Sequence, residues 1–423
     1  MLTIQNSELH EDRFSRLRLI PWWDQTKIAA CKVLVIGAGA LGNEILKNLA
    51  LLGFRLVVVV DLDRIDESNL SRAVLFRVED IGEFKANVAA KAYGSLAPGA
   101  QVRPLAVNVL REGGLGLFAW SDIILAGLDN REARLWINRS AWKVNRPWID
   151  GAIEGINGVA RVFLPGAAPC YECTLGAVDW EILERRMSCN LLAVEEAPDG
   201  KVPTTPTISS IVAGIQVQEA VKLLHGLPTL KGSGFVFEGL NHSSYRVEYT
   251  ENPDCMSHYT LPEIVALAES SEDLTLDQLW QRASRDLQTD KAVVEFSRDV
   301  IQRLVCPQCK DEQELFVPAG AVSYEAGRCP GDKQMRVVHA VHSFDGSGSF
   351  GARKLSQLGL PRFDIFTARS LSREIGYLIA GDAKQVLGPL ANVRAETCSG
   401  QPSDRAETTE ARSGWSSDRQ EGA

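Results

Sequence analysis

The sequence predicts an α/β protein with a Rossmann-like doubly wound sheet, followed by a smaller C-terminal α+β domain. The apolar run over residues 33–36 suits a parallel strand buried on both faces, and it leads directly into a glycine-rich turn over residues 37–42. A second apolar run, over residues 56–60, ends in an acidic residue. Beyond about residue 258, short apolar runs surround one amphipathic helix, a pattern typical of a separate α+β unit.

The glycine-rich turn has the spacing of a phosphate-binding loop. Gly37, Gly39 and Gly42 follow the G-x-G-x-x-G pattern, which lets the backbone approach a phosphate group closely. Apolar residues at helical spacing come next and end at Gly53, which predicts a helix with a left-handed C-terminal cap. The N-terminus of that helix would direct N–H groups at the phosphate. Asp61 lies nineteen residues after Gly42, where a carboxylate reaches ribose hydroxyls.

The polar residues that follow bear on which nucleotide is bound. The glycine fingerprint is shared by nicotinamide and flavin enzymes, so by itself it favours a Rossmann oxidoreductase. Arg72 and Lys85 argue otherwise, because two cations suit a triphosphate and stabilise charge that develops on its phosphoryl oxygens. The alternative is an ordinary exposed, charged loop.

The middle of the chain supplies the rest of the predicted sheet. The predicted strands cover residues 102–109, 123–128, 148–152 and 159–164, and a long helix covers residues 208–225. Asp129 follows one of these strands and would lie at the carboxyl edge of the sheet, where open α/β folds bind ligands. A carboxylate there is a typical ligand for Mg²⁺.

Further motifs occur in a fixed order along the chain. They are Arg13-Phe-Ser-Arg16, the glycine loop, Asp61-Leu-Asp-Arg-Ile-Asp-Glu-Ser-Asn-Leu-Ser-Arg72, Asp129-Asn130, Cys170-Tyr-Glu-Cys173, Cys189 and Pro203-Thr-Thr-Pro-Thr207. In these motifs, over roughly residues 10–250, the sequence resembles the ubiquitin-activating enzymes and the sulfur-carrier adenylyltransferases of the ThiF/MoeB/HesA family. Ala73 departs from the family, which usually carries Gln after the arginine.

The resemblance implies a ThiF-type ATP-binding adenylation domain over residues 1–258, with ATP and Mg²⁺ as cofactors. The implied site has Asp61 on the ribose, Asp63, Asn69, Arg72 and Lys85 along the phosphates, and Asp129 on magnesium with Asn130 beside it. Family members are dimers in which an arginine near the N-terminus reaches the neighbouring active site, and Arg16 matches that position. The alternative for Arg16 is an ordinary surface charge.

The cysteines predict a metal site. Nine cysteines without a signal peptide indicate a reducing compartment, where paired cysteines are more often metal ligands than disulfides. Cys170 and Cys173 form one C-x-x-C pair, and Cys255 with His258 offers a second pair. By the resemblance these four residues hold a structural zinc ion, and four ligands would close its coordination shell. The alternative is a free cysteine and a surface histidine beside an ordinary loop.

Cys189 stands apart from the paired cysteines and is the candidate nucleophile. Its neighbours Arg185 and Arg186 would favour the thiolate, the reactive form of the side chain. Residues 189–207 have the composition of a flexible crossover loop that could carry the thiol to an acyl group. A buried structural cysteine is the alternative, and the place of Cys189 in the family pattern argues against it.

The remaining residues predict a small α+β domain over 259–392 and a disordered tail over 393–423. Thr275 and Gln278 form a capping box, and short apolar runs include 292–296, 300–305, 337–341 and 363–366. The segment is faintly similar to the ubiquitin-fold domain that ends many ubiquitin-activating enzymes. Cys306-Pro-Gln-Cys309 and Cys329-Pro-Gly-Asp332 resemble a zinc ribbon whose fourth cysteine has become Asp. Either Asp332, His339 or His342 completes a metal site there, or packing holds a degenerate ribbon.

Composition narrows the class of protein. A net charge of −9 and a pI near 5.4 argue against a large nucleic-acid-binding face. The apolar runs are too short to span a bilayer and no targeting segment is visible, so a cytoplasmic enzyme is expected.

The expected function is ATP-dependent activation of the C-terminal carboxylate of a small ubiquitin-like protein, by adenylation and then thioester formation on Cys189. The expected partners are that ubiquitin-like or sulfur-carrier protein with its Gly-rich C-terminus, a conjugating enzyme, and a second copy of this chain. The alternatives are a sulfur-carrier adenylyltransferase for thiamin, molybdopterin or tRNA thiolation, a Rossmann oxidoreductase, and an inactive adaptor subunit.

Overall fold

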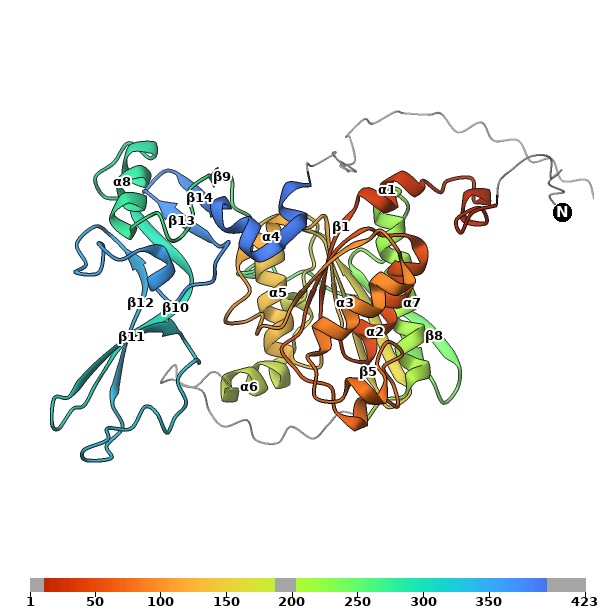
Figure 1. Ribbon diagram of the computed structural model, residues 1–423, viewed down its shortest axis with the longest axis horizontal. Helices are drawn as coiled ribbons and strands as arrows, with labels where there is room; N and C mark the ends of the chain where they lie inside the picture. Colours follow the sequence, from red (N-terminus) through yellow and green to blue (C-terminus); the bar gives the residue numbers. More distant parts are fainter. Residues whose placement is uncertain (1–10, 187–202, 394–423) are drawn as a thin grey trace, which may run out of the picture.

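Two β-sheets organise the chain, each with its own helices (Figure 1). The computed structural model describes residues 11–186 and 203–393. The first sheet has eight strands in the order β3-β2-β1-β4-β5-β6-β7-β8, of which β3, β2, β1, β4 and β5 run parallel and the rest antiparallel. Their bounds are β1 (Lys32–Ile36), β2 (Leu56–Val60), β3 (Gln101–Leu105), β4 (Ile123–Ala126), β5 (Trp148–Glu154), β6 (Asn157–Phe163), β7 (Ser233–Glu238) and β8 (Ser243–Glu248).

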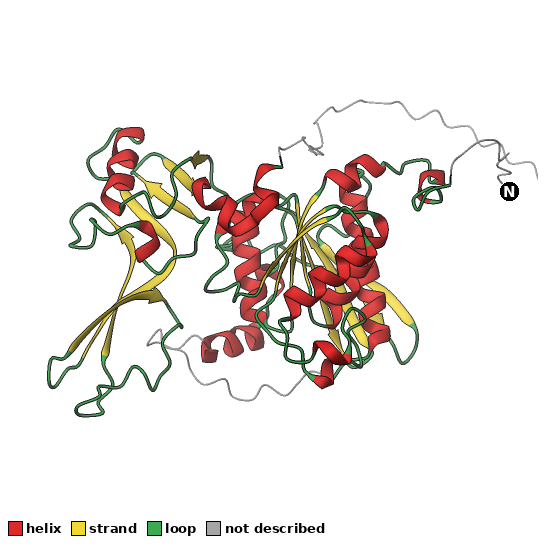
Figure 2. Ribbon diagram, in the orientation of Figure 1, coloured by secondary structure: helices red, strands yellow, loops and turns green. Residues whose placement is uncertain are grey.

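Helices cover both faces of this sheet (Figure 2). They are α1 (Gln25–Ala30), α2 (Ala40–Leu52), α3 (Lys85–Leu96), α4 (Leu115–Trp120), α5 (Arg131–Lys143), α6 (Ala177–Arg186) and α7 (Pro206–Leu224). Side chains of β1 alternate between two cores: Val33 and Val35 pack with α2 and α7, while Leu34 and Ile36 pack with α4 and α5. The doubly wound α/β prediction is therefore confirmed, and the apolar run is continuous because both of its faces are buried.

Most predicted elements of the first sheet are found within a few residues of their expected positions. Gly53 ends α2 with a φ of 89°, in the left-handed conformation. The strand expected over 102–109 is shorter, because β3 ends at Leu105 and Asn108 then accepts a hydrogen bond from Leu110 N–H in a turn. The long helix α7 begins at Pro206 with Thr205 as its N-cap, two residues before the predicted start.

The second sheet has six strands and lies beside α4 and α5 of the first unit (Figure 1). Its strands are β9 (Ile264–Leu267), β10 (Val293–Val305), β11 (Glu312–Pro318), β12 (Val337–Phe344), β13 (Ile365–Arg369) and β14 (Glu374–Ile379), with α8 (Leu276–Asp286) and α9 (Ala383–Leu387). The predicted capping box of Thr275 and Gln278 begins α8. The runs over 292–296 and 300–305 belong to one strand, β10, whose pairing with β12 shifts register between Glu295 and Val300.

The long strand β10 serves two parts of the second unit. Its first residues pair with β13 on one side and with the end of β12 on the other, whereas the residues from Val300 onward pair with β11 and β12. These later pairings form a three-stranded projection, the β10–β12 finger, which extends away from the first unit in Figure 1. The resemblance of this unit to a ubiquitin fold stays a prediction.

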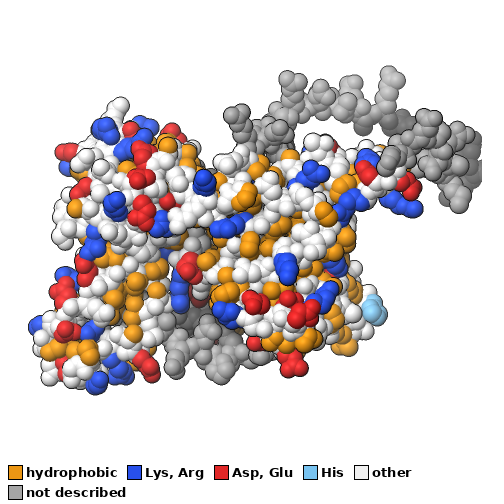
Figure 3. Space-filling model, in the orientation of Figure 1, with side chains coloured by type: hydrophobic (Ala, Val, Ile, Leu, Met, Phe, Trp, Pro, Cys, Tyr) orange, Lys and Arg blue, Asp and Glu red, His pale blue; other side chains and the backbone are white. Residues whose placement is uncertain are grey.

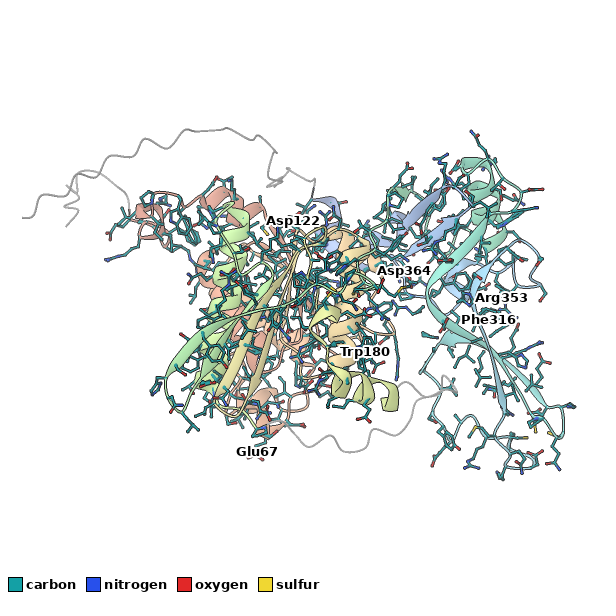
Figure 4. All side chains as sticks on the ribbon, turned by 180° about the vertical axis from the view of Figure 1, so that it is seen from behind. Glu67, Asp122, Trp180, Phe316, Arg353 and Asp364 are labelled. Atoms are coloured by element: carbon teal, nitrogen blue, oxygen red, sulfur yellow. The ribbon has the colours of Figure 1, made fainter. Side chains whose placement is uncertain are left out.

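The two units share a core. Asp364, labelled in Figure 4, accepts a hydrogen bond from Leu115 N–H at 2.7 Å and so begins helix α4 of the first unit. The guanidinium of Arg298 donates to Leu110 O and to Gly113 O, both at 2.7 Å, and lies over the ring of Trp136. Apolar side chains of both units form one cluster, which includes Leu115, Leu117, Phe363 and Ile365. Contacts of this kind hold the second unit against α4 and α5.

Charged groups are spread over the molecule. On the face in Figure 3, acidic and basic side chains are interspersed over both units. Within the described ranges, no helix is long and apolar enough to span a lipid bilayer.

Candidate active site and metal cluster

The glycine loop lies where the strand order of the first sheet reverses. β1 is followed in the sheet by β2 on one side and β4 on the other, and open α/β folds bind ligands at the carboxyl ends of such a pair. A Cβ on Gly42 would lie 1.9 Å from Gly37 O, and one on Gly37 would lie 2.5 Å from Gly127 O. A Cβ on Gly39 would meet nothing within 4 Å. Gly37 and Gly42 therefore let the backbone close up, while Gly39 leaves open space for a phosphate at the start of α2.

Asp61 joins the end of β2 to the glycine loop. Its Oδ2 accepts a hydrogen bond from Ala38 N–H at 2.6 Å, and its Oδ1 accepts one from Asp63 N–H at 2.8 Å. Burial raises the pKa of Asp61, and these amides and the positive charge of Lys85 act in the opposite direction. Each carboxylate oxygen has a second lone pair, so the contacts leave acceptor capacity for ribose hydroxyls.

Lys85 is fixed beside the same edge of the sheet. It is the first residue of α3, and its Nζ forms an ion pair with Asp63 Oδ2 at 2.8 Å. The backbone repeats the connection, because Lys85 N–H donates to Asp63 O at 2.9 Å. The structure therefore brings Asp61, Asp63 and Lys85 together with the glycine loop.

Asn69 and Arg72 are held within their own turn. Asn69 Oδ1 accepts a hydrogen bond from Asp66 N–H at 3.0 Å, and Arg72 donates to Ser68 O at 2.8 Å. Ala73, where the family usually has Gln, is buried. Within the described residues, no contact joins Arg72 directly to the glycine loop. The segment that follows this turn is connected to the loop through the side chain of Asn43.

Asn43 makes that connection, and the sequence interpretation assigned it no role. Its buried side chain donates to Ala38 O at 2.7 Å and to Gly39 O at 3.1 Å, and its Oδ1 accepts from Leu75 N–H at 2.8 Å. It thereby fastens the glycine loop to the segment that carries Arg72. An amide directly after Gly42, in an otherwise apolar helix start, is the signal that could have revealed it.

Asp129 lies on the opposite side of β1, after β4. It is exposed, and its carboxylate makes no hydrogen bond to the described parts of the chain. Asn130 caps α5, since its Oδ1 accepts from Glu132 N–H at 2.8 Å and from Ala133 N–H at 3.3 Å. Asn130 therefore orients the loop of Asp129, and its oxygen is already engaged by the helix.

A buried charge cluster supports the same loop and was not predicted. Asp150 is fully buried between Arg134, whose Nε lies 2.9 Å from Oδ1, and Arg161, whose Nε lies 3.0 Å from Oδ2. Burial alone would raise the pKa of Asp150, but the two guanidinium groups outweigh it and hold the pKa below its usual value. Arg134 also donates to Leu128 O, the carbonyl that precedes Asp129. The cluster fixes the backbone from which the Asp129 carboxylate projects.

The structure brings the four predicted metal ligands together. Cys170 Sγ lies 3.8 Å from Cys173 Sγ and 3.5 Å from Cys255 Sγ, and Cys173 Sγ lies 3.3 Å from His258 Nε2. All four ligand atoms lie within 4.8 Å of one another. Tetrahedral zinc with Zn–S bonds of about 2.3 Å requires sulfur atoms about 3.8 Å apart, so this set fits a closed zinc site.

Neighbouring groups hold this first cluster in place. His258 stacks on Trp142 of α5, and its Nδ1 lies 3.7 Å from Glu251 Oε1. Burial raises the pKa of Cys170 and of Cys255, so a bound cation is needed to keep them as thiolates. The resident ion would therefore tie the segment after β6 to the segment after β8.

Two predicted residues are not joined to this site. Arg16 is exposed, and its guanidinium has no hydrogen-bond partner in the ranges that the structure describes. Cys189 lies outside the described residues, which end at 186 and resume at 203.

A doubly wound sheet with a glycine loop and a fixed lysine at its switch point defines a Rossmann-like α/β protein, and its Cys₃His cluster has a donor set that could hold a metal ion such as zinc. The family model described as "ThiF family" matches residues 12–257, more than half of the chain. The chain belongs to the ThiF family.

Individual relatives match different shares of the chain. The NEDD8-activating enzyme E1 catalytic subunit of Arabidopsis thaliana is 43% identical over 157 residues, which are 34% of this chain and 34% of that protein. The SUMO-activating enzyme subunit uba-2 of Caenorhabditis elegans is 41% identical over 36% of this chain and 27% of that protein. The sulfur carrier protein adenylyltransferase of Thermus thermophilus is 30% identical over 58% of this chain and 89% of that protein. The chain thus spans about a third of the length of the first of these relatives.

Solved structures match a similar share of the chain to the sulfur-carrier relative. A crystal structure of Escherichia coli MccB with ATP is 22% identical, with a TM-score of 0.48, over 59% of this chain and 75% of that chain.

Proposed function

We propose that this protein uses ATP to activate the C-terminal carboxylate of a small ubiquitin-like protein, first as an acyl-adenylate and then as a thioester. One observation carries the proposal: Lys85, fixed by Asp63, and the exposed Asp129 carboxylate flank the open glycine loop from its two sides. A lysine ammonium group on one side and a carboxylate that can bind Mg²⁺ on the other suit the phosphates of a nucleoside triphosphate.

In the first step, a carboxylate oxygen of the partner attacks the α-phosphorus of ATP. A new P–O bond forms as the bond to the β-phosphate oxygen breaks, and pyrophosphate leaves. Lys85 and Arg72 would stabilise the negative charge on the phosphoryl oxygens, together with Arg16 of a second copy in a homodimer. Asp129 would hold Mg²⁺, which supplies further positive charge when bound. Asp61 would hold the ribose.

In the second step, the Cys189 thiolate attacks the acyl carbon of the adenylate. A C–S bond forms, the bond between the acyl carbon and the phosphate oxygen breaks, and AMP leaves. The product keeps the acyl group transferable to a conjugating enzyme. We assign the adenylation chemistry to residues 1–258 and recruitment to residues 259–392, in a cytoplasmic enzyme with structural zinc on the first cluster.

A second candidate is adenylation of a sulfur carrier, in which sulfur replaces AMP without a thioester on Cys189. The observation that favours it is coverage, because the chain matches 89% of the Thermus thermophilus relative but only about a third of the first E1 subunits. The six-stranded second unit has no assigned part in this chemistry.

The deciding experiment combines the full chain with Mg-ATP and a small β-grasp protein that ends in glycine and is encoded beside it. Pyrophosphate release and a thiol-sensitive adduct on a nonreducing gel are measured for wild type and Cys189→Ala. Both signals in wild type, with the adduct alone lost in the variant, support the proposal. Pyrophosphate release without an adduct would support sulfur transfer. The absence of both signals would support an adaptor or an oxidoreductase.

A matched pair of lysine variants tests the site itself. Lys85→Ala should lower ATP–pyrophosphate exchange by about 10²–10³-fold, the usual cost of removing one fixed group from a developing oxyanion. Lys91→Ala changes an exposed residue on the same helix and should leave the exchange rate unchanged. Equal rates for the two variants would contradict the role given to Lys85.

A further inference from the structure

Two turns of the β10–β12 finger have the same sequence pattern and the same backbone geometry. The first covers residues 306–311, Cys-Pro-Gln-Cys-Lys-Asp, between β10 and β11. The second covers residues 329–334, Cys-Pro-Gly-Asp-Lys-Gln, before β12. In the pairing of the two turns, Asp332 stands where the first turn has Cys309.

The hydrogen bonds of the two turns correspond one to one. Cys306 N–H donates to Asp311 O at 2.8 Å, and Cys329 N–H donates to Gln334 O at 2.8 Å. Lys310 N–H donates to Cys306 O at 3.2 Å, and Lys333 N–H donates to Cys329 O at 3.0 Å. Lys310 and Lys333 both take a positive φ, of 63° and 61°. The two turns therefore have the same backbone conformation, although they lie in different parts of the sequence.

The matched turns point their side chains at a common centre. Cys309 Sγ lies 3.5 Å from Cys329 Sγ, and Cys306 Sγ lies 3.2 Å from Asp332 Oδ2. All four ligand atoms lie within 4.8 Å of one another, although all of β11 and the loop that follows it separate the two turns in the sequence.

We propose that Cys306, Cys309, Cys329 and Asp332 form a second zinc site, which joins the two turns at the end of the finger. Three thiolates and one carboxylate oxygen supply the four ligands of a closed tetrahedral site, and zinc accepts both ligand types. Asp332 completes the site in place of His339 or His342, which belong to strand β12 and are absent from the cluster. The site is independent of the proposed adenylation chemistry.

The finger needs such a link because its own core is small. Its separate apolar cluster has two buried members, Ile301 and Leu304, with a few partly buried neighbours. A core of this size does not hold three strands together in water, and small units of this kind use a metal or a disulfide. The ion pair between Arg336 and Asp311 is a further polar contact across the same end.

Metal content of the full chain tests the proposal. We expect two zinc ions per chain after purification in reducing, chelator-free buffer, and one in the double variant Cys309→Ser/Cys329→Ser. Cys173→Ser should lose the other ion, and Cys398→Ser, which changes none of the eight proposed ligands, should keep two. Zinc content that the double variant does not change would overturn the proposal. So would iron in place of zinc, or a Cys309–Cys329 disulfide found by mass spectrometry.

Cobalt substitution tests Asp332 directly and does not depend on a destabilised variant. Cobalt in both sites of the wild type would be bound by six thiolates, so Asp332→Cys should raise the intensity of thiolate-to-cobalt absorption by about one sixth. Asp332→Ala should weaken cobalt binding at one site only. An unchanged spectrum in Asp332→Cys would show that residue 332 does not touch the metal, and the proposal would fall.

Discussion

The two cysteine clusters have nearly the same ligands but very different surroundings. The first, Cys170, Cys173, Cys255 and His258, lies against α5 of the large sheet, with Trp142 stacked on its histidine. The second lies at the end of the finger, where Cys309 is exposed and the nearby core has two buried residues. The same coordination chemistry is therefore expected to have different consequences, because the surroundings decide how much structure depends on each ion.

The first cluster is connected to the nucleotide edge of the sheet. Glu172, between its first two cysteines, pairs with Arg139 of α5. Tyr171 packs against Arg161, which pairs with the buried Asp150, and Asp150 also holds Arg134 beneath the loop of Asp129. The finger has no contact of this kind with the site among the described residues, so changes there should stay local.

The largest effect is expected from the charge cluster that supports the first region. Asp150→Ala would leave two buried guanidinium groups without their carboxylate, at a cost of about 3–5 kcal/mol and a fall in Tm of about 6–20 °C. Calorimetry of the full chain measures it. Asp129→Ala removes an exposed carboxylate on the adjoining loop and should leave Tm unchanged. Similar Tm values for both variants would contradict the link between the cluster and stability.

The stability that the Asp150 carboxylate contributes should depend on pH in one direction. Because the folded-state pKa of Asp150 is held below the usual value of 3.8, its charge stabilises the fold above that pH. The stabilisation is lost only as the pH falls below 3.8 and through the lower folded-state value. The difference in stability between wild type and Asp150→Ala should therefore stay constant from neutral pH to about pH 5 and shrink in stronger acid. A difference that changes between pH 6 and 8 would point to another group.

Removing one ligand from each cluster sharpens the comparison. Cys173→Ser should cost about 3 kcal/mol, roughly a quarter of the binding free energy of a structural zinc ion, and lower Tm by about 6–12 °C. Cys309→Ser should shift Tm by less than about 2 °C, because the finger opens without melting the larger cores. Limited proteolysis should instead cut that variant within residues 306–335. Equal Tm shifts for Cys173→Ser and Cys309→Ser would contradict the expected difference between the two clusters.

Sequence patterns were sufficient where the signal is local. The glycine loop, the strands before and after it and each cysteine pair follow from residues close together in the chain, whereas the joining of the two distant pairs of the first cluster came from the family resemblance. Asp150 was missed because its partners, Arg134 and Arg161, are sixteen and eleven residues away on other elements, a separation that no periodicity reveals. The long strand β10 was divided into two because its register shift interrupts the apolar alternation.

Asn130 shows how one pattern can have two uses. Its neighbour Asp129 suggested a ligand role, yet Asn130 begins α5 as an N-cap, a role that Asn followed by Arg-Glu-Ala also indicates. Asn43 was overlooked for the opposite reason, since its three contacts are made to backbone atoms that only the folded loop brings near.

The finger site should release zinc about a hundredfold faster than the first cluster, because one of its ligands, Cys309, is exposed and another is a weaker carboxylate. A zinc indicator added to the full chain should report a fast phase and a slow phase of equal size. The fast phase should be absent in Cys309→Ser and slower in Asp332→Cys. A single phase in wild type would mean that the surroundings do not distinguish the two sites.

The smallest effect is expected from the carboxylate behind the first cluster. Glu251 lies 3.7 Å from His258 Nδ1, and when the opposite nitrogen binds metal this carboxylate orients the ring and strengthens it as a ligand. Glu251→Gln should therefore weaken zinc binding at the first site by about tenfold, near the lower limit for such partners because Glu251 is more than half exposed. Competition with a chelator measures the affinity, and Asp254→Asn on the same loop is the control. A stronger effect of Asp254→Asn would mean that loop charge in general, rather than the Glu251–His258 contact, supports the ion.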